Sequence, residues 1–219
     1  MGRIEQTGGQ TRTHYRSGSG EDTRERLLAA ALAQFAERGF YGASIAQIAG
    51  ELDLTKQALL YYFKRKEDIY AEVLRLIADR LLAATYSQVK EGDPPDVQFE
   101  SMIMGIFAEA RARPDDSRVL LRELMDNQRR DAPADSWYLK TWLDALVEQL
   151  NKVESLDWMP FPQKFAAIYQ MLSAIECFVV SGPTLSRMYG EEGFAQITEA
   201  YPIELREQVR GLLQCKPDD

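Results

Sequence analysis

The sequence contains very little histidine and cysteine, and their scarcity argues against several classes of function. Among 219 residues there is one histidine, His14, and there are two cysteines, Cys177 and Cys215. A single histidine argues against a zinc site and histidine-dependent catalysis, and two cysteines give no disulfide framework. The chain also lacks a glycine-rich phosphate loop and a nucleophile–base pair. We therefore expect no catalytic residues, no metal site and no cofactor, and hence no enzyme.

Long apolar runs are also missing. No segment approaches the roughly 20 consecutive apolar residues that a membrane span needs, and the N-terminus lacks the charged-then-apolar pattern of a signal peptide. The apolar content of 45% and the charged content of 27% are ordinary for a soluble globular protein. These observations predict a cytoplasmic protein with no membrane partner.

Alternating strand patterns are absent, and nearly every segment after residue 21 has helical periodicity. We expect an all-α fold, with short helices after Ser44 and Thr55 and a long helix over about 66–90. Adjacent prolines end that long helix. Further helices are expected at roughly 96–112, 115–129, 135–153, 161–181 and 191–213. The predicted domains are a flexible basic arm (1–20), a three-helix domain with a helix–turn–helix (21–66), and a larger helical domain (67–219).

The net charge of −8 is divided unevenly along the chain. Residues 1–66 carry 10 Lys/Arg and 7 Asp/Glu, for +3, and residues 67–219 carry 16 and 27, for −11. Such asymmetry indicates a division of labour between the two parts. Because the positive part is small, any DNA affinity must depend on well-placed contacts more than on bulk charge.

The third predicted helix has a short polar face. Leu59 and Phe63 are one turn apart and pack inward, so Gln57 and Tyr61 project outward together. Lys56 and Ala58 lie at the start of the same helix. Lysine can donate to guanine, glutamine can pair with adenine, and a methyl or an aromatic ring can contact a thymine methyl.

Possible phosphate contacts surround this face. The helix starts at Ser44 and Thr55 offer hydroxyls and free backbone N–H groups to phosphates. Lys64, Arg65 and Lys66 form a cationic cluster beside them. The pattern as a whole is typical of a domain that places a helix in the DNA major groove.

Residues 22–70 resemble the DNA-binding domain of the TetR family of bacterial transcriptional regulators, most specifically in the run LLYYFKRKEDIY. The resemblance implies phosphate contacts from Ser44, Thr55, Tyr62 and Lys66. It also implies that four side chains face the bases: Lys56, Gln57, Ala58 and Tyr61. It further implies a homodimer, formed by the helices at 161–181 and 191–213, and a ligand pocket in the C-terminal domain.

Three positions depart from the pattern of the family. Leu60 stands where a phosphate-contacting tyrosine is common, and Ala46 stands where some members read a base with a longer polar side chain. Asp53 replaces a frequent glycine of the turn. Aspartate tolerates a left-handed conformation better than most residues, so we expect the turn to form.

The C-terminal domain offers few indications of its ligand. Candidate lining residues are Met102, Phe107, Met125, Trp137, Tyr169 and Glu176. Ordinary packing is an alternative for each of them. Among the polar residues within apolar helices, which include Arg122, Glu123 and Gln170, Glu176 stands out because a buried carboxylate needs a partner or a raised pKa.

The predicted function is that of a ligand-responsive regulator, expected to be a repressor that a small-molecule effector releases from a palindromic double-stranded DNA operator. An effector acts in this way only if it binds two conformers unequally. Two alternatives remain open at this stage: a helical adaptor that binds only protein, and an enzyme built on a helical bundle.

Overall fold

The computed structural model describes residues 20–126 and 138–216, and within these ranges every regular element is a helix. The predicted all-α class is confirmed. The predicted arm at 1–20 lies outside the described residues except for Gly20, which begins the first helix. The elements are α1 (Gly20–Gly42), α2 (Ile45–Gly50), α3 (Lys56–Tyr62), α4 (Lys66–Tyr86), α5 (Pro95–Ala112), α6 (Pro114–Asp126), α7 (Tyr138–Leu150), a 3-10 helix (Glu154–Leu156) and α8 (Phe161–Leu213).

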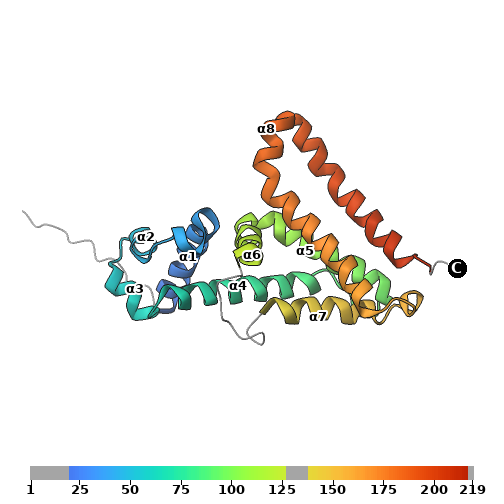
Figure 1. Ribbon diagram of the computed structural model, residues 1–219, viewed down its shortest axis with the longest axis horizontal. Coiled ribbons are helices and arrows are strands. Elements are labelled where there is room, and N and C mark those ends of the chain that lie inside the picture. Colours follow the sequence, from blue (N-terminus) through green and yellow to red (C-terminus); the bar gives the residue numbers. More distant parts are fainter. Residues whose placement is uncertain (1–19, 127–137, 217–219) are drawn as a thin grey trace, which may run out of the picture.

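Helices α1 to α3 form a small layer at one end of the molecule (Figure 1). Leu27 of α1, Ile48 of α2 and Leu59 of α3 are completely buried and belong to the same apolar cluster. The helical part of α1 stops at Gly39, as predicted, where φ is 69°. A short turn then leads to α2, so that each helix presents one apolar face to a shared core.

Helix α4 joins this small layer to the rest of the molecule. Its buried stripe, made by Ile69, Val73, Ile77 and Leu81 at intervals of four residues, packs on α1 near its start and on α5 and α7 farther along. The long shared helix is thus confirmed, although it ends at Tyr86 and not near residue 90. α5 approaches it so closely that a Cβ at Gly105 would lie 2.3 Å from the carbonyl oxygen of Ala84.

The buried side chains of both parts form one continuous apolar cluster. Helix α6 packs on α1 as well as on α8, so it touches the small layer and the larger domain together. The two predicted domains are therefore joined through α4 and α6, and their apolar cores are continuous.

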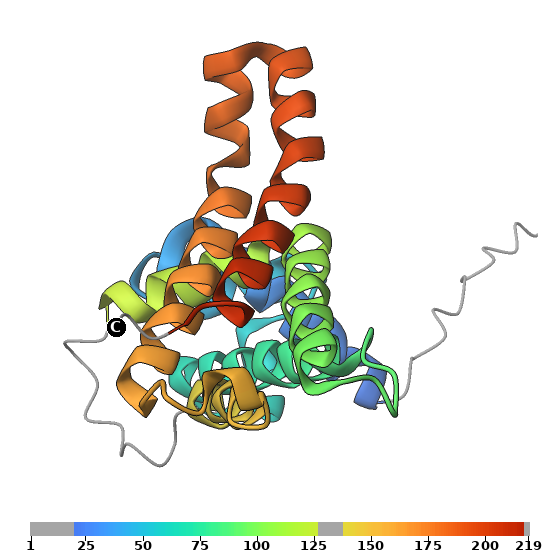
Figure 2. The ribbon, with the colours of Figure 1, turned by 90° about the vertical axis from the view of Figure 1, so that its right-hand side faces the viewer.

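Helix α8 is a hairpin of two antiparallel arms that projects from the body (Figures 1 and 2). We expected the first arm to end near residue 181, but the helix continues through Pro183. The chain reverses at Gly190, where φ is 74°, a conformation that glycine adopts easily and that ends helices. Pro202 lies within the second arm. A proline removes one hydrogen bond and can be tolerated as a local bend.

The α8 hairpin leaves much apolar surface uncovered. An 18-residue window within α8 has a mean hydropathy of 1.5, enough to cross a membrane by length and composition alone, and 33% of it is buried. The expectation that no segment is so apolar was therefore wrong. Core helices of soluble proteins pass the same test, and it is weak support for a membrane span. The large apolar side chains exposed on α8 are Phe161, Tyr169, Met188, Tyr189 and Ile203.

Candidate nucleic-acid interface

Side-chain caps fix the starts of both short helices. The Ser44 hydroxyl accepts a hydrogen bond from the backbone N–H of Gln47 at 3.1 Å. The Thr55 hydroxyl accepts one from the N–H of Ala58 at 3.2 Å. Each cap satisfies one N–H of the first turn and leaves the others directed outward, where they can meet a phosphate. Both predicted caps are confirmed.

The predicted reading face of α3 is exposed. Tyr61 is 85% exposed, and Lys56 and Gln57 are also exposed, whereas Leu59 on the opposite side is completely buried. Ala58 is half-buried at the edge of this face. The structure therefore places the four residues that were expected to face bases at one outward surface, with no core role for the Tyr61 ring.

Tyr62 lies beside this face and extends toward the start of α1. Its hydroxyl would be 3.8 Å from a Cβ at Gly20, and its ring meets that of Tyr61 edge-on at 5.4 Å. The position is compatible with the expected phosphate contact, since the hydroxyl is near the solvent-exposed N-terminus of α1.

Lys66 has an internal role that the sequence did not reveal. Its ammonium donates to the carbonyl oxygen of Ala43 at 3.0 Å and lies 4.5 Å from the centre of the Phe40 ring. The start of α4 is thereby attached to the turn that precedes α2. No signal in the sequence relates positions so far apart, so reasoning from spacing could not find this contact.

The other two cations of the cluster face solvent. Lys64 is exposed, and Arg65 pairs with Asp68 at 2.8 Å across the first turn of α4. The Arg65 guanidinium keeps the pKa of Asp68 below its ordinary value, chiefly through this hydrogen bond. Lys64 thus remains the side chain of this cluster that is most available to a phosphate.

The expected consequences of the unusual positions can be followed in the structure. Asp53 has a φ of 57°, so the left-handed turn forms without glycine, as predicted. Leu60 is half-buried and offers no hydroxyl, and Ala46 is exposed with a side chain too short to reach a base. That these two residues make no DNA contact stays a prediction.

Two adjacent residues of α6 connect the larger domain to this interface. An Nη of Arg122 donates to the carbonyl oxygen of Glu37 at 3.1 Å, near the end of α1. The carboxylate of Glu123, which is buried, accepts a hydrogen bond from the Tyr70 hydroxyl at 2.9 Å. Both residues are candidate pocket residues from the sequence, but Arg122 instead holds a carbonyl of the DNA-binding domain, and Glu123 holds Tyr70 of α4, whose ring packs on Phe40 of α1.

The ring of Tyr70 extends this connection. It meets the Phe40 ring edge-on at 5.1 Å, and the Lys66 ammonium lies above the same Phe40 ring. Because Lys66 also holds the Ala43 carbonyl just before the Ser44 cap, packed and hydrogen-bonded groups are continuous from α6 to the start of α2.

The candidate ligand residues do not gather at one place. Met102 and Phe107 of α5 are buried, and Phe107 stacks on Tyr201 of α8 at 5.3 Å. Tyr169 is 43% exposed and stacks on a neighbouring ring of its own helix. Met125 is 72% exposed at the last turn of α6, so in this structure it does not line an interior site. Trp137 lies outside the described residues.

Glu176 is buried beside other polar groups of the larger domain. Burial raises the pKa of its carboxyl; the Ser117 hydroxyl opposes that shift through a hydrogen bond, and nearby Asp116 adds to it. Asp116 itself is held by Arg80 of α4 at 2.9 Å. Oε2 of Glu176 is buried and has no hydrogen-bond partner among the described residues. The prediction that Glu176 is a buried carboxylate with a partner or a raised pKa is thus confirmed.

Comparisons with known proteins agree with this geometry. Residues 27–73 match the model of the bacterial regulatory proteins of the tetR family. The chain is 34% identical over 102 residues to the HTH-type transcriptional regulator RutR of Escherichia coli K12, covering 47% of this chain and 48% of that protein. It is 31% identical over 114 residues to the HTH-type transcriptional repressor SCO4008 of Streptomyces coelicolor, covering 52% and 55%. The matched segments thus span about half the length of these relatives.

The fold as a whole is shared with solved structures. The transcriptional regulator SCO4942 from Streptomyces coelicolor superposes with a TM-score of 0.66 at 22% identity, covering 87% of this chain and 97% of that one. The ketosteroid transcriptional regulator KstR2 of Mycobacterium tuberculosis gives 0.62 at 19% identity, covering 87% and 96%. At such identities the likeness establishes the arrangement of the helices alone.

Proposed function

The chain belongs to the TetR family of bacterial regulatory proteins, and on that premise we propose that it is a transcriptional repressor released from DNA by a small-molecule effector. The observation that carries the proposal is the exposed polar face of α3, which is backed by a completely buried Leu59 and begins at a capped N-terminus. A short helix built in this way can enter a major groove and present Lys56, Gln57 and Tyr61 to base edges. Such a function is exercised in the cytoplasm.

We further propose that the α8 hairpin forms the interface of a homodimer. Its uncovered apolar side chains, including Met188, Tyr189 and Ile203, are the kind of surface that a monomer in water rarely keeps exposed. Two α8 hairpins packed about a two-fold axis would form a four-helix interface. The two α3 helices would then meet half-sites about 34–36 Å apart, which favours a palindromic operator.

Release would follow from movement of α4 and α6. Both helices belong to the larger domain and also hold the DNA-binding layer, through Tyr70–Glu123 and through Arg122 on the Glu37 carbonyl. An effector that prefers a conformer with shifted α4 would change the separation of the two α3 helices. In this proposal, residues of the larger domain select the effector, and residues of the DNA-binding interface do not contact it.

The test is a mobility-shift assay with DNA selected from a random pool and with DNA upstream of the gene for this chain. The native protein should bind one sequence specifically at moderate salt. Tyr61→Ala should remove the preference for that sequence over random DNA, because it deletes a side chain of the reading face that is 85% exposed. Tyr41→Ala, which removes an exposed tyrosine outside α3, is the matched control and should keep the preference.

Two results would count against the proposal. Failure to select any sequence would remove the DNA-binding function and favour an adaptor that binds protein. Equal specificity of Tyr61→Ala and the native protein would show that α3 does not read bases with this face. Sedimentation of each variant confirms that its assembly is unchanged.

A further inference from the structure

A surface groove lies between α5 and the second arm of α8, far along the chain from the DNA-reading helix. Its lining comes from the segment after α4, from the second half of α5 and from α8: Gln88, Met104, Phe107, Ala108, Arg111, Ala112 and Arg206. The hollow exists because α5 presents two alanines, Ala108 and Ala112, where longer side chains would fill the space.

The floor of the groove is apolar and well supported. Phe107 and Met104 are buried, and the Phe107 ring stacks at 5.3 Å on Tyr201 of the facing arm. Tyr201 in turn stacks on Phe178 of the first arm at 3.8 Å, so the floor rests on both arms of the hairpin. Such a floor would exclude water from the apolar part of a bound molecule and keep its own shape.

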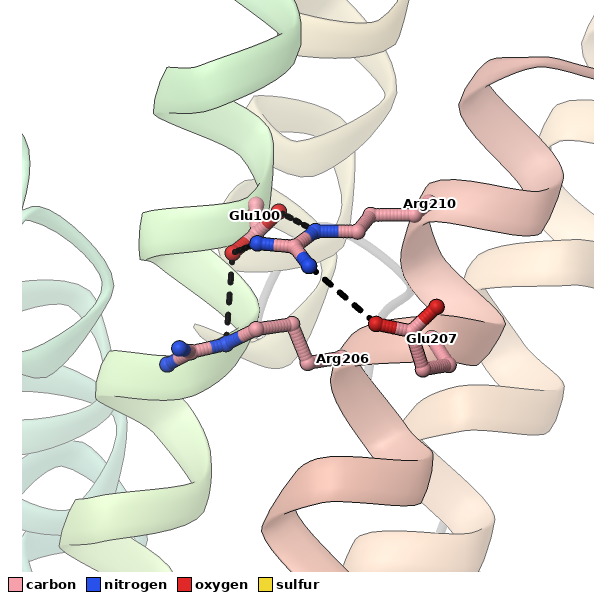
Figure 3. A network of polar contacts seen from close by, with 4 residues as sticks. All are labelled: Glu100, Arg206, Glu207 and Arg210. Atoms are coloured by element: carbon pink, nitrogen blue, oxygen red, sulfur yellow. Dashed lines mark hydrogen bonds and ion pairs between the residues drawn. The ribbon is translucent and has the colours of Figure 1, made fainter.

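Two guanidinium groups line the same groove. Arg111 lies 5.7 Å from the centre of the Phe107 ring and makes no ion pair with any described residue. Arg206 uses its Nε to contact Glu100 at 3.2 Å, and its terminal nitrogens point away from Glu100 (Figure 3). Both side chains therefore have donors that remain for an anion.

The ion network at the edge of the groove leaves the charge of Arg111 uncompensated. Glu100 is shared between Arg206 and Arg210, and Glu207 also pairs with Arg210 at 3.1 Å (Figure 3). These four residues sum to zero, so Arg111 makes the groove positive. This local sign is opposite to that of residues 67–219, which carry a net charge of −11. A cationic groove in an acidic domain favours an anionic ligand.

We propose that this groove binds an amphipathic organic anion, with a carboxylate or phosphate held by Arg111 and Arg206 and an apolar body on Met104, Phe107 and Ala108. The proposal deepens the proposed function, because it names a class of effector and a place for it between α5 and α8. Guanidinium groups suit both head groups through paired hydrogen bonds. The experiment below distinguishes a carboxylate from a phosphate as the head group of the ligand.

The experiment is a calorimetric titration of DNA-free protein with decanoate, decyl phosphate and decan-1-ol, each below its aggregation concentration. We expect saturable binding of at least one anion, at least about ten-fold tighter than the neutral alcohol, since one charge-assisted contact is worth about that factor. The ratio between decanoate and decyl phosphate tells which head group the groove prefers.

Variants locate the binding site. Arg111→Gln combined with Arg206→Gln should weaken anion binding by about ten-fold or more while leaving Glu100 its Arg210 partner. Ala108→Trp should fill the floor and block the anions and the alcohol together. Arg113→Gln, which removes a guanidinium of the same region that pairs with Glu109 outside the groove, is the matched control.

Three results would overturn the proposal: no binding of either anion, equal binding of the alcohol, or native affinity in the double arginine variant. A failure of the native protein to bind any DNA would instead contradict the proposed function. That failure would not bear on the groove proposal, because the titration that tests the groove uses no DNA. Addition of the bound anion to the operator complex then shows whether the groove ligand releases DNA.

Discussion

At the scale of single residues, Lys66 shows how one side chain can serve structure and DNA together. Its ammonium is attached to the Ala43 carbonyl and the Phe40 ring, whereas the neighbouring Lys64 is exposed. Removal of Lys66 should therefore affect folding as well as binding, and removal of Lys64 should affect binding alone.

Lys66→Ala is expected to lower the free energy of unfolding by about 1–2 kcal/mol, because a charge-assisted hydrogen bond and a cation–π contact are lost. It should also weaken binding to all DNA sequences and reduce the salt dependence by about one unit. Lys64→Ala should weaken binding and reduce the salt dependence in the same way, with stability within about 0.5 kcal/mol of native. Urea unfolding and shift assays at several salt concentrations measure both effects. Unchanged stability of Lys66→Ala would contradict its internal role, and an unchanged salt slope would contradict its phosphate contact.

Glu176 gives a prediction about pH. Burial raises the pKa of its carboxyl in the folded protein, so the folded state holds the proton at pH values where the unfolded chain has lost it. Stability should therefore fall as pH rises from the ordinary glutamate pKa through the raised one. Glu176→Gln should remove this fall, and the variant should be more stable than the native protein at neutral pH and not at acidic pH.

Urea unfolding of both proteins between pH 4 and pH 8 measures the difference. Asp116, whose pKa burial also raises against the pull of Arg80, interacts electrostatically with Glu176, so the pH dependence of the difference includes the coupling of the two carboxyl groups. A constant difference across that range would mean that Glu176 titrates at its ordinary pKa in the folded state.

At the scale of elements, the sequence was most informative where a local signal determines the structure. The caps at Ser44 and Thr55 and the left-handed turn at Asp53 depend on neighbours within three or four residues, and all three are confirmed. The two arms of α8 show the limit of this reasoning. Pro183 is a strong local breaker, yet the helix continues to Gly190, and Phe178 of this arm packs on Phe194 of the second arm. The run Gly190-Glu191-Glu192 indicates the end of the first arm better than Pro183 does, because glycine ends helices and acidic residues favour the start of the next one.

In the candidate DNA-binding site, too, local features could be predicted from the sequence and long-range contacts could not. The outward face of α3 follows from helical geometry once Leu59 is assigned to the core. The contacts of Lys66, Arg122 and Glu123 join segments 23 to 85 positions apart, and no periodicity in a single sequence reports them. Positions that couple the two domains therefore had to come from the structure.

The contact between α4 and α6 provides a prediction at this scale. Tyr70→Phe and Glu123→Leu should each destabilise the protein, and a double-mutant cycle should show a coupling of about 2 kcal/mol, as expected for a buried hydrogen bond to a carboxylate. Each single variant should also change the affinity for the operator although neither residue touches DNA. Additive effects on unfolding would show that the hydrogen bond does not join the two helices energetically.

At the scale of the whole molecule, the acidic and basic regions lie in different parts of one body. The DNA-reading layer lies at one end of the molecule, and α6 lies between α1 of that layer and the α8 hairpin (Figure 1). The net charge of −11 on residues 67–219 would repel DNA from the larger domain, so the proposed DNA contact depends on the exposed face of α3. Correct spacing of two reading helices then depends on how the hairpins of two copies meet.

Ile203→Glu tests this dependence. Ile203 is 63% exposed on the second arm of α8, so the variant should fold as stably as the native protein while placing a charge in the proposed interface. We expect the dimer to dissociate at least about ten-fold more easily, and affinity for a two-half-site operator to fall with it. Gln208→Glu, an exposed polar position of the same arm, adds the same charge and should leave assembly unchanged. Sedimentation velocity and circular dichroism separate loss of assembly from loss of folding. A stable dimer of Ile203→Glu that still binds the full operator would place the interface away from this surface of the hairpin.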